Sequence, residues 1–361
     1  MWSPLRVHFV PQSVSVPIMT ETTLRMSDRV PDQPIHGTDE VCAIVVTYRP
    51  DAAFPARLSA VSAQVGMTVI IDNGSADAER GMLREAASGP KIELVFNAEN
   101  LGLARALNIG IQRAATLGFS WVLLLDQDTR AEPDMVRTLL AIHASSPDRK
   151  RVAVLGSNFH DATGRTADAI GHASPDGHWE EVERVITSGS LLPLKAHAAI
   201  GPFREEFFID YVDEEYCLRA RAKGYRIIRS RRYLMSHAIG SPTVHKMFGT
   251  GKWTTNHGPD RRYYIARNNT VLLREYGNYR AGMWAWKSLR RCLRQCKRIA
   301  LYEQMKTRKI IAVFQGLRDG IRGRMGPRNA RLGASAASPA ATTSDASGRK
   351  SRGEHLRGSV R

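Results

Sequence analysis

The 361-residue chain has little cysteine and no long hydrophobic run. Its four cysteines, Cys42, Cys217, Cys292 and Cys296, are too few for a disulfide framework in a chain of this length. Cys292 and Cys296 have no second Cys or His pair at zinc-ligand spacing, which excludes a zinc finger. No apolar run approaches the roughly 18 residues that a membrane-spanning helix requires. These absences exclude a disulfide-rich secreted domain and an integral membrane protein, and they favour the reducing cytosol.

The N-terminus lacks the continuous apolar core of a signal peptide, because Pro4, Pro11 and Pro17 interrupt the first 20 residues. Residues 1–39 are polar and rich in Pro, Ser and Thr, which predicts a flexible leader, with Met19 or Met26 as an alternative start. We therefore expect a cytoplasmic protein.

Acidic residues are scarce at the other end of the chain. Lys287–Arg361 holds 19 Lys and Arg against 4 Asp and Glu, a net charge of +15, whereas the preceding residues carry only +2. Two apolar sets recur there at helical spacing: Trp286, Leu289, Leu293, Cys296 and Ala300, and then Ile310, Phe314, Leu317 and Ile321. We expect basic amphipathic helices over 281–324 and a disordered basic tail over 325–361. Two interpretations stay open: contact with an anionic membrane surface, aided by Trp284 and Trp286, or packing on the domain with a solvated basic face.

Apolar strands alternate with helical segments from Val41 onward. The pattern predicts strands over 41–47, 67–71, 92–96 and 121–125, with helices over 54–64, 77–87 and 103–117 between them. A helix over 133–144 follows, then strands over 152–157, 185–194 and 225–229, with a helix over 214–223 before the last. Continuous apolar strands separated by helices are typical of a parallel sheet covered on both faces, so we expect an α/β fold.

Polar clusters follow the first four strands, where ligands bind in such sheets. The clusters are Thr47-Tyr48, Asp72–Ser75, Asn97–Gly102 and Asp126–Asp128. In the last of these, LLLDQDT, Asp126 and Asp128 are spaced so that both side chains point the same way at the strand end. Two carboxylates suit a divalent cation carrying a diphosphate. The alternative is an ordinary surface turn.

A second acidic cluster contains Asp213, Glu214 and Glu215. Asp213 is a candidate general base that removes a proton from a hydroxyl, and Glu215 is a candidate for orienting the acceptor. Their alternative role is to favour the dipole of the following helix. His237 is either a structural histidine or a third metal ligand, in which case Mn²⁺ tolerates its nitrogen better than Mg²⁺ does.

The remaining candidates each have a structural alternative. Asp72 accepts a hydrogen bond from a nucleotide base or makes an Asx turn with Gly74. Tyr48 stacks on a base or packs on its loop, and Asn100 binds a ligand or caps the next helix. Arg262 and Arg267, near the start of a later helix, meet phosphates or the acceptor, or form a solvated basic face.

Together these segments resemble the family 2 glycosyltransferases with the GT-A fold, over roughly residues 41–275. Six ordered blocks carry the resemblance: IVVTYRPD (44–51), IIDNGS (70–75), NAENLGLARALNIGI (97–111), LLLDQDT (123–129), FFIDYVDEEYCLRARAKGYRI (207–227) and SHAIGS (236–241). The DQD and IDYVDEEYCLR segments are most similar to bacterial rhamnosyltransferases that use dTDP-L-rhamnose. The resemblance implies a Rossmann-like, mixed but mostly parallel sheet flanked by helices, with the catalytic domain over 40–280.

The resemblance also implies roles for individual residues. Thr47, Tyr48 and Asp72 would hold the base, and Asn100 and Asp126 the nucleoside. Asp128 and His237 would bind Mg²⁺ or Mn²⁺, and Asp213 would be the base of an inverting transfer. Ser188 and Gly189 lie where the family shapes the donor and acceptor pocket. Many relatives have Glu-Asp-x-Asp where this chain has Val212-Asp213-Glu214-Glu215, so the role of the first acid is unfilled.

The implied acceptor is a lipid-linked glycan or other cell-surface polysaccharide, which places the protein at the inner face of the cytoplasmic membrane. Three rival functions remain. One is transfer from another nucleotide sugar. Another is a haloacid-dehalogenase-type phosphatase, because Asp126-x-Asp128-Thr129 matches its nucleophile motif, although three strand–helix units precede it and no Gly-Asp-x3-Asp motif follows. The third is nucleic-acid binding, prompted by a pI near 10.1, although the basicity is confined to the tail.

Overall fold

The computed structural model describes residues 37–161, 172–174, 176–237, 243–247, 250–254, 256–277 and 283–328. Residues 1–36 of the expected leader and residues 329–361 of the expected tail lie outside the described residues. The structure begins with a short 3-10 helix, Thr38–Glu40, that leads directly into the first strand.

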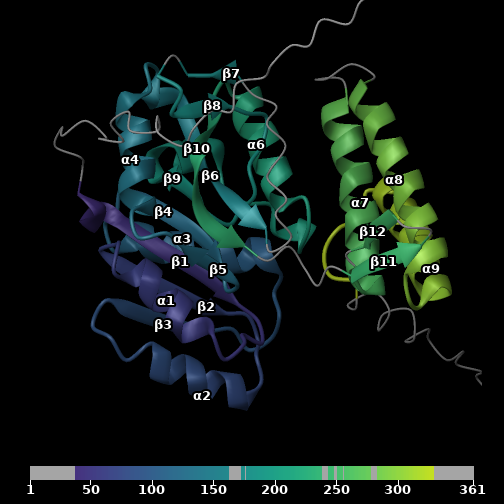
Figure 1. Ribbon diagram of the computed structural model, residues 1–361, viewed down its shortest axis with the longest axis horizontal. Helices are drawn as coiled ribbons and strands as arrows, with labels where there is room; N and C mark the ends of the chain where they lie inside the picture. Colours follow the sequence, from purple (N-terminus) through teal and green to yellow (C-terminus); the bar gives the residue numbers. More distant parts are fainter. Residues whose placement is uncertain are drawn as a thin grey trace, which may run out of the picture.

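A ten-stranded mixed sheet forms the body of the protein, in the order β3-β2-β1-β4-β9-β6-β10-β8-β7, with β5 paired to β10 (Figure 1). The strands are β1 (Val41–Thr47), β2 (Met67–Asp72), β3 (Ile92–Phe96), β4 (Trp121–Asp126), β5 (Thr129–Ala131), β6 (Val152–Asp161), β7 (His172–Ala173), β8 (Trp179–Glu181), β9 (Ser190–Pro193) and β10 (Arg226–His237). Strands β1 to β4 run parallel, as do β6 and β10, whereas β9 is antiparallel to both β4 and β6. The predicted α/β fold with a mixed sheet is confirmed.

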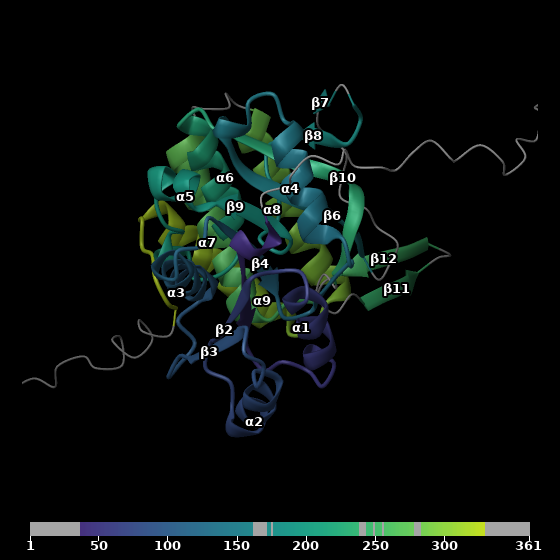
Figure 2. The ribbon, with the colours of Figure 1, turned by 90° about the vertical axis from the view of Figure 1, so that its left-hand side faces the viewer.

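Helices cover both faces of the sheet, as continuous apolar strands require. The helices are α1 (Phe54–Ser62), α2 (Asp77–Ala86), α3 (Leu103–Thr116), α4 (Met135–Ser145), α5 (Leu194–Ile200) and α6 (Val212–Ala222). Alternate residues of β1 point to opposite faces: Ile44 packs in the core with α3, α5 and α6, whereas Val45 packs in the core with α1, α2 and α4. Figure 2 shows α3 and α5 on one side of the sheet and α1 and α4 on the other.

Three C-terminal helices stand together beside the sheet: α7 (Pro259–Tyr276), α8 (Met283–Tyr302) and α9 (Lys306–Ile321), with the hairpin β11 (Thr243–Met247) and β12 (Thr250–Thr254) next to them (Figure 1). Helix α9 packs closely on α7, because Gly316 and Gly320 leave room for the facing backbone. A Cβ at Gly316 would lie 2.3 Å from the carbonyl oxygen of Tyr263. The domain boundary predicted at residue 280 falls between α7 and α8. Helix α9, which follows that boundary, packs on α7, which precedes it.

The structure corrects several predicted boundaries. Strand β10 continues to His237, eight residues beyond the predicted end, and its far half pairs with β5 instead of with β8. The predicted strand over 185–194 is reduced to β9, because Gly189 adopts a φ of +76° and turns the chain just before it. Helix α6 starts at Val212, two residues earlier than predicted.

The apolar residues of the C-terminal helices are divided between the interior and the surface. Leu293, Phe314 and Ile321 are 60%, 63% and 66% exposed, whereas Ile299 and Val313 are buried between the helices. On α9 the close glycine contact with α7 turns Ile310 and Leu317 toward the helix bundle and leaves Phe314 and Ile321 outside, so both interpretations of these helices stay open. Among the described helices, none is long and apolar enough to cross a membrane.

Candidate active site

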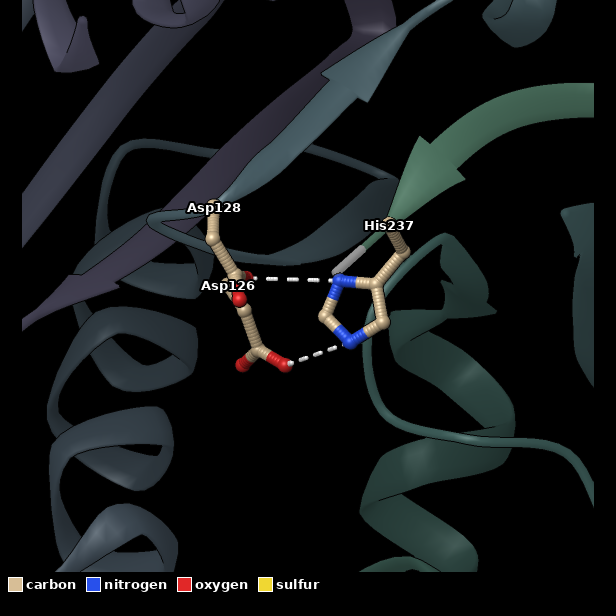
Figure 3. Close-up of side chains that lie close together, drawn as sticks. All are labelled: Asp126, Asp128 and His237. Atoms are coloured by element: carbon tan, nitrogen blue, oxygen red, sulfur yellow. Dashed lines mark ion pairs between the residues drawn. The ribbon is translucent and has the colours of Figure 1, made fainter. Parts of the chain in front are cut away.

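The end of strand β4 carries Asp126 as its last residue, and Asp128 follows two residues later. Strand β5 begins immediately afterwards at Thr129 and pairs antiparallel with the end of β10, so that Thr129 lies opposite His237. This register brings His237 next to Asp128 although more than 100 residues separate them in the sequence. Figure 3 shows the two carboxylates and the imidazole facing one another across the gap between the strands.

The three side chains are arranged as a metal site would require. His237 Nδ1 lies 3.3 Å from Asp128 Oδ1, and His237 Nε2 lies 3.9 Å from Asp126 Oδ2 (Figure 3). One ligand atom from each residue lies within 4.8 Å of the others. Asp128 Oδ1 is buried and accepts no hydrogen bond from the described residues, so it is available to a cation. Two carboxylates and one imidazole therefore fit a divalent cation, as predicted for Asp128 and His237.

A chain of hydroxyl groups holds this cluster from behind. Thr129 Oγ1 lies 2.9 Å from His237 Nδ1 and 2.6 Å from Ser188 Oγ, and Ser188 Oγ accepts a hydrogen bond from the backbone N–H of Asp126 at 3.0 Å. Such partners fix the ring orientation of a ligating histidine and leave its other nitrogen for the metal. Thr129 was not singled out from the sequence, although it ends the LLLDQDT block.

The charge balance of the cluster favours binding of a cation. Burial raises the pKa of Asp126, and the neighbouring Asp128 adds to the rise, whereas His237 and Arg261 oppose it. A divalent cation between the carboxylates would relieve their repulsion and keep both ionised.

Asp213 occupies the second position of α6 and contacts the backbone next to Ser188, which itself contacts the cluster. Its Oδ2 accepts a hydrogen bond from the backbone N–H of Thr187 at 3.3 Å, and its Oδ1 accepts one from the N–H of Glu214 at 2.9 Å. Thr187 is bonded directly to Ser188, whose hydroxyl contacts the N–H of Asp126. The adjacent residues Thr187 and Ser188 therefore connect Asp213 to the backbone of Asp126.

The Asp213 carboxyl has a raised pKa. Burial raises its pKa to about 7, and the charge of Glu214 contributes, while the N–H groups of Glu214 and Thr187 lower it. A carboxyl that titrates near neutral pH is suited to accept a proton during a reaction.

The residues predicted to hold a nucleotide base lie at the ends of β1, β2 and β3. Asp72 is fully buried and accepts hydrogen bonds from the Thr47 hydroxyl at 3.1 Å and from the Ser75 N–H and hydroxyl at 3.1 and 2.5 Å. Its oxygens are thus engaged within the loops, as the turn alternative predicts. Tyr48 is 41% exposed beside these loops, and its ring lies under the Arg49 guanidinium.

Asn100 belongs to the same edge. Its Oδ1 accepts hydrogen bonds from Asn73 Nδ2 at 3.0 Å and from the Gly102 N–H at 2.9 Å, which ties the loop after β2 to the loop after β3. The structure therefore brings Thr47, Tyr48, Asp72 and Asn100 together as one shelf beside β4.

Two pocket predictions agree with the geometry and three do not. Ser188 contacts the Asp126–Asp128–His237 cluster, and Gly189 lies next to it, where its N–H donates to the Leu124 carbonyl at 2.8 Å. Glu215 is fully buried, and its carboxylate accepts hydrogen bonds from the Arg219 guanidinium and the Tyr276 hydroxyl. Arg262 pairs with Glu303, and Arg267 donates to the backbone carbonyls of Glu206, Phe207 and Gly326. Their charges need these buried partners, so the structure does not bring Glu215, Arg262 or Arg267 to the pocket.

Arg261 is the basic residue that the sequence prediction missed. Its guanidinium forms two-point hydrogen bonds of 3.1–3.2 Å with Asp210, and its charge opposes the raised pKa of Asp126. Because successive helix residues differ by about 100° in direction, Arg261 faces this edge of the protein while the adjacent Arg262 is buried. The sequence signal that could have distinguished the two arginines is the apolar periodicity of α7, which shows which side of the helix is buried.

The chain is similar to several known proteins. Residues 42–167 match the family model described as Glycosyl transferase family 2. The dTDP-rhamnosyl transferase RfbF of Shigella flexneri is 28% identical over 247 residues, covering 65% of this chain and 80% of that protein. The galactofuranosyltransferase GlfT1 of Mycolicibacterium smegmatis is 31% identical over 266 residues, covering 66% of this chain and 85% of that protein. The crystal structure of S. aureus TarS has a TM-score of 0.47 and 14% identity, and the match covers 81% of this chain but only 50% of the TarS chain.

Proposed function

The chain belongs to the family 2 glycosyltransferases, and from that premise we propose that it transfers L-rhamnose from dTDP-L-rhamnose to a hydroxyl of a lipid-linked glycan, with inversion at the anomeric carbon. The enzyme class and the GT-A fold follow from the family. The sugar is supported by the similarity to the dTDP-rhamnosyl transferase RfbF, and the galactofuranosyltransferase GlfT1 makes another nucleotide sugar the alternative.

The observation that supports the proposal is that two adjacent residues contact both parts of the proposed site: Thr187 donates its N–H to Asp213, and Ser188 contacts the Asp126–Asp128–His237 cluster through Asp126 and Thr129. In this proposal the shelf formed by Thr47, Tyr48, Asp72 and Asn100 holds the nucleotide. Tyr48 offers an exposed ring for the base, and the buried Asp72 keeps its loop in shape. The donor diphosphate then lies toward β4, where ligands bind in sheets of this kind.

Asp128 and His237 would hold a divalent cation, with Asp126 beside them. When bound, the cation neutralises the negative charge that develops on the departing diphosphate. The imidazole ligand favours Mn²⁺ over Mg²⁺, which prefers oxygen ligands. Thr129 and Ser188 keep the imidazole turned toward the carboxylates.

Asp213 would act as the general base. Its carboxylate accepts the proton of the acceptor hydroxyl while the hydroxyl oxygen attacks the anomeric carbon from the side opposite the leaving diphosphate, which inverts that centre. A pKa raised to about 7 makes the carboxylate a strong enough base near neutral pH. Glu214 is held by Arg184 at 2.9 Å and contributes by raising that pKa.

The C-terminal helices support a place at the inner face of the cytoplasmic membrane, in the biosynthesis of a cell-envelope polysaccharide. On α9, the exposed residues Ile311, Phe314, Arg318 and Ile321 follow one another along one side of the helix. On α8, Leu293, Lys297 and Leu301 do the same. Apolar side chains flanked by basic ones suit the surface of an anionic bilayer, where lipid-linked acceptors reside.

A donor panel tests the enzymatic part of the proposal. The purified protein is incubated with dTDP-L-rhamnose, UDP-galactofuranose and GDP-mannose in the presence of Mn²⁺ or Mg²⁺, and nucleotide release is measured by chromatography. We expect dTDP release that requires a divalent cation and is lost in Asp213→Asn. Release from a different nucleotide sugar would replace the rhamnose assignment, and phosphate release from simple esters would favour a phosphatase.

A further inference from the structure

We propose that Asn268, on α7, is a positioning residue that sets the place of Asp213. The inference rests on the proposed function, because it assigns Asn268 an effect that passes through the proposed base. The feature that carries it is the segment Phe207–Tyr211, which connects a short 3-10 helix, Glu205–Phe207, to the first turn of α6.

Three residues of this segment have a backbone conformation that side chains other than glycine rarely adopt. Phe208, Asp210 and Tyr211 have φ values of +66°, +62° and +65°. Such conformations are disfavoured by contact between Cβ and the backbone, and they persist only where surrounding contacts impose them. Tyr211 is also the N-cap of α6, so its conformation sets the direction in which the helix and Asp213 leave the segment.

Asn268 supplies these contacts through one amide group. Its Nδ2 lies 3.0, 2.9 and 2.8 Å from the carbonyl oxygens of Phe207, Ile209 and Asp210, so its two hydrogens are shared among three acceptors. The residue is fully buried. Its Oδ1 accepts a hydrogen bond from Arg267 Nε at 2.9 Å, which fixes which end of the amide faces the segment. One side chain therefore holds three carbonyls on either side of the strained residues.

The segment also contacts the donor side of the proposed site. The carbonyl oxygen of Phe208 accepts a hydrogen bond from the Leu103 N–H at 2.6 Å, and a Cβ at Gly102 would lie 2.7–2.9 Å from Phe208. Gly102 in turn donates its N–H to Asn100. By holding this segment, Asn268 fixes the distance between the nucleotide shelf and Asp213. A misplacement of about 1 Å in a reacting geometry lowers turnover by up to roughly 100-fold.

Asn268 makes this contact without reaching the pocket itself. It lies beneath the segment on α7, and α9 holds α7 in place through the close approach of Gly316 and Gly320. Its effect is therefore expected on the rate of transfer rather than on donor binding, because Asp213 moves while the shelf residues stay tied to one another.

The test compares Asn268→Ala with Asn269→Ala in the full chain. Asn269 is the adjacent buried asparagine, and its Oδ1 accepts no hydrogen bond from the described residues, which makes it a matched control. We expect Asn268→Ala to lower kcat by about 10- to 100-fold, while the Kd for dTDP with Mn²⁺, from calorimetry, changes less than about twofold. Asn269→Ala keeps kcat within about twofold of the wild-type value. Equal kcat losses in both variants, or a loss of dTDP affinity equal to the loss in kcat, would overturn the proposal.

A double-variant cycle separates positioning from general damage to the fold. In the Asp213→Asn background the base is absent, so adding Asn268→Ala should lower the residual transfer by less than about twofold, because residues that act as a unit are non-additive. If Asn268→Ala lowers transfer by the same factor in both backgrounds, Asn268 does not act through Asp213. If Asp213→Asn itself keeps full activity, the proposed base fails and this result identifies that failure separately.

Asn268→Ser carries the test if the alanine variant does not fold. The serine hydroxyl keeps one donor toward the segment, so we expect a kcat between those of the wild type and the alanine variant, with an unchanged dTDP Kd. A wild-type kcat in Asn268→Ser, with a circular dichroism spectrum like that of the wild type, would refute the need for the amide.

Discussion

Replacing Asp213 by asparagine should lower catalysis by orders of magnitude and stabilise the fold. The catalytic loss follows from removal of a general base, which contributes about 10²- to 10⁴-fold. The gain in stability follows from the raised pKa of Asp213, because the folded protein holds the proton of this carboxyl more tightly than the unfolded chain does. Asparagine has nearly the same shape and never becomes charged; its oxygen keeps the 2.9 Å contact with the Glu214 N–H, and the lost contact is the longer one of 3.3 Å with the Thr187 N–H.

The structure sets the size of the gain. The pKa of Asp213 rises from 3.8 to about 7, and burial is the main cause. At about 1.36 kcal/mol per pH unit, a rise of this size corresponds to at most roughly 4 kcal/mol. The side chain keeps some contact with solvent, so we expect about 1–2 kcal/mol. The cost is absent below about pH 4, grows as the pH rises, and is complete above about pH 7.

Urea denaturation at pH 5 and pH 8, followed by circular dichroism, measures this difference, alongside the transfer assay. We expect the free energy of unfolding of Asp213→Asn to exceed that of the wild type by more at pH 8 than at pH 5. Asp39→Asn, at an exposed carboxyl, provides a control with no such pH-dependent gain. An Asp213→Asn variant that is less stable at pH 8, or that transfers sugar at the wild-type rate, would refute the reasoning.

The remaining predictions concern the metal, the pH profile, the membrane and the helix contact. Asp128→Ala should lose Mn²⁺-dependent dTDP binding, measured by calorimetry, and an unchanged titration contradicts its role as a ligand. Glu214→Gln should shift the acid limb of the kcat/KM profile, expected near pH 7 in the wild type, to lower pH, because the charge of Glu214 helps to raise the pKa of Asp213; an unmoved limb excludes Asp213 as the titrating group. Phe314→Glu combined with Ile321→Glu should weaken sedimentation with anionic liposomes about tenfold, while Leu117→Glu, at an exposed leucine on another helix, should not; equal partitioning argues for a soluble basic face. Gly316→Ala should lower the free energy of unfolding by about 1–3 kcal/mol, because its Cβ would meet the Tyr263 carbonyl, and an unchanged thermal melting temperature would show that α9 moves freely away from α7.

The first half of the fold could be predicted closely from the sequence. Strands β1 to β4 are continuous apolar runs bounded by polar clusters, so their ends and the positions of Asp126 and Asp128 follow from local pattern alone. The second half could not be predicted as well. The extension of β10 to His237 is paired with the far half of β6 and with β5, which is a three-residue strand without a sequence pattern of its own.

The site shows the same division. Asp128, His237 and Asp213 were identified because their residue types match a chemistry and a family motif. Arg262 and Arg267 were placed in the pocket because their charge was visible in the sequence, whereas their burial against Glu303 and against backbone carbonyls depends on how α7 packs. Asn268 could be assigned from the sequence only to the same phosphate or acceptor contacts, and its proposed positioning role depends on the three carbonyls that the fold brings around it.

The pairing of β5 with β10 has a consequence for how this enzyme can be divided. A fragment ending at residue 167, where the family match stops, would keep the carboxylates after β4 but would have neither His237 nor Asp213. Such a fragment would be an incomplete nucleotide-binding module with no means of reaction. The later residues join the earlier ones through strand pairings that include β4 with β9, β6 with β10 and β5 with β10, so a cut at residue 167 would remove strands from the middle of the sheet as well as these two proposed site residues.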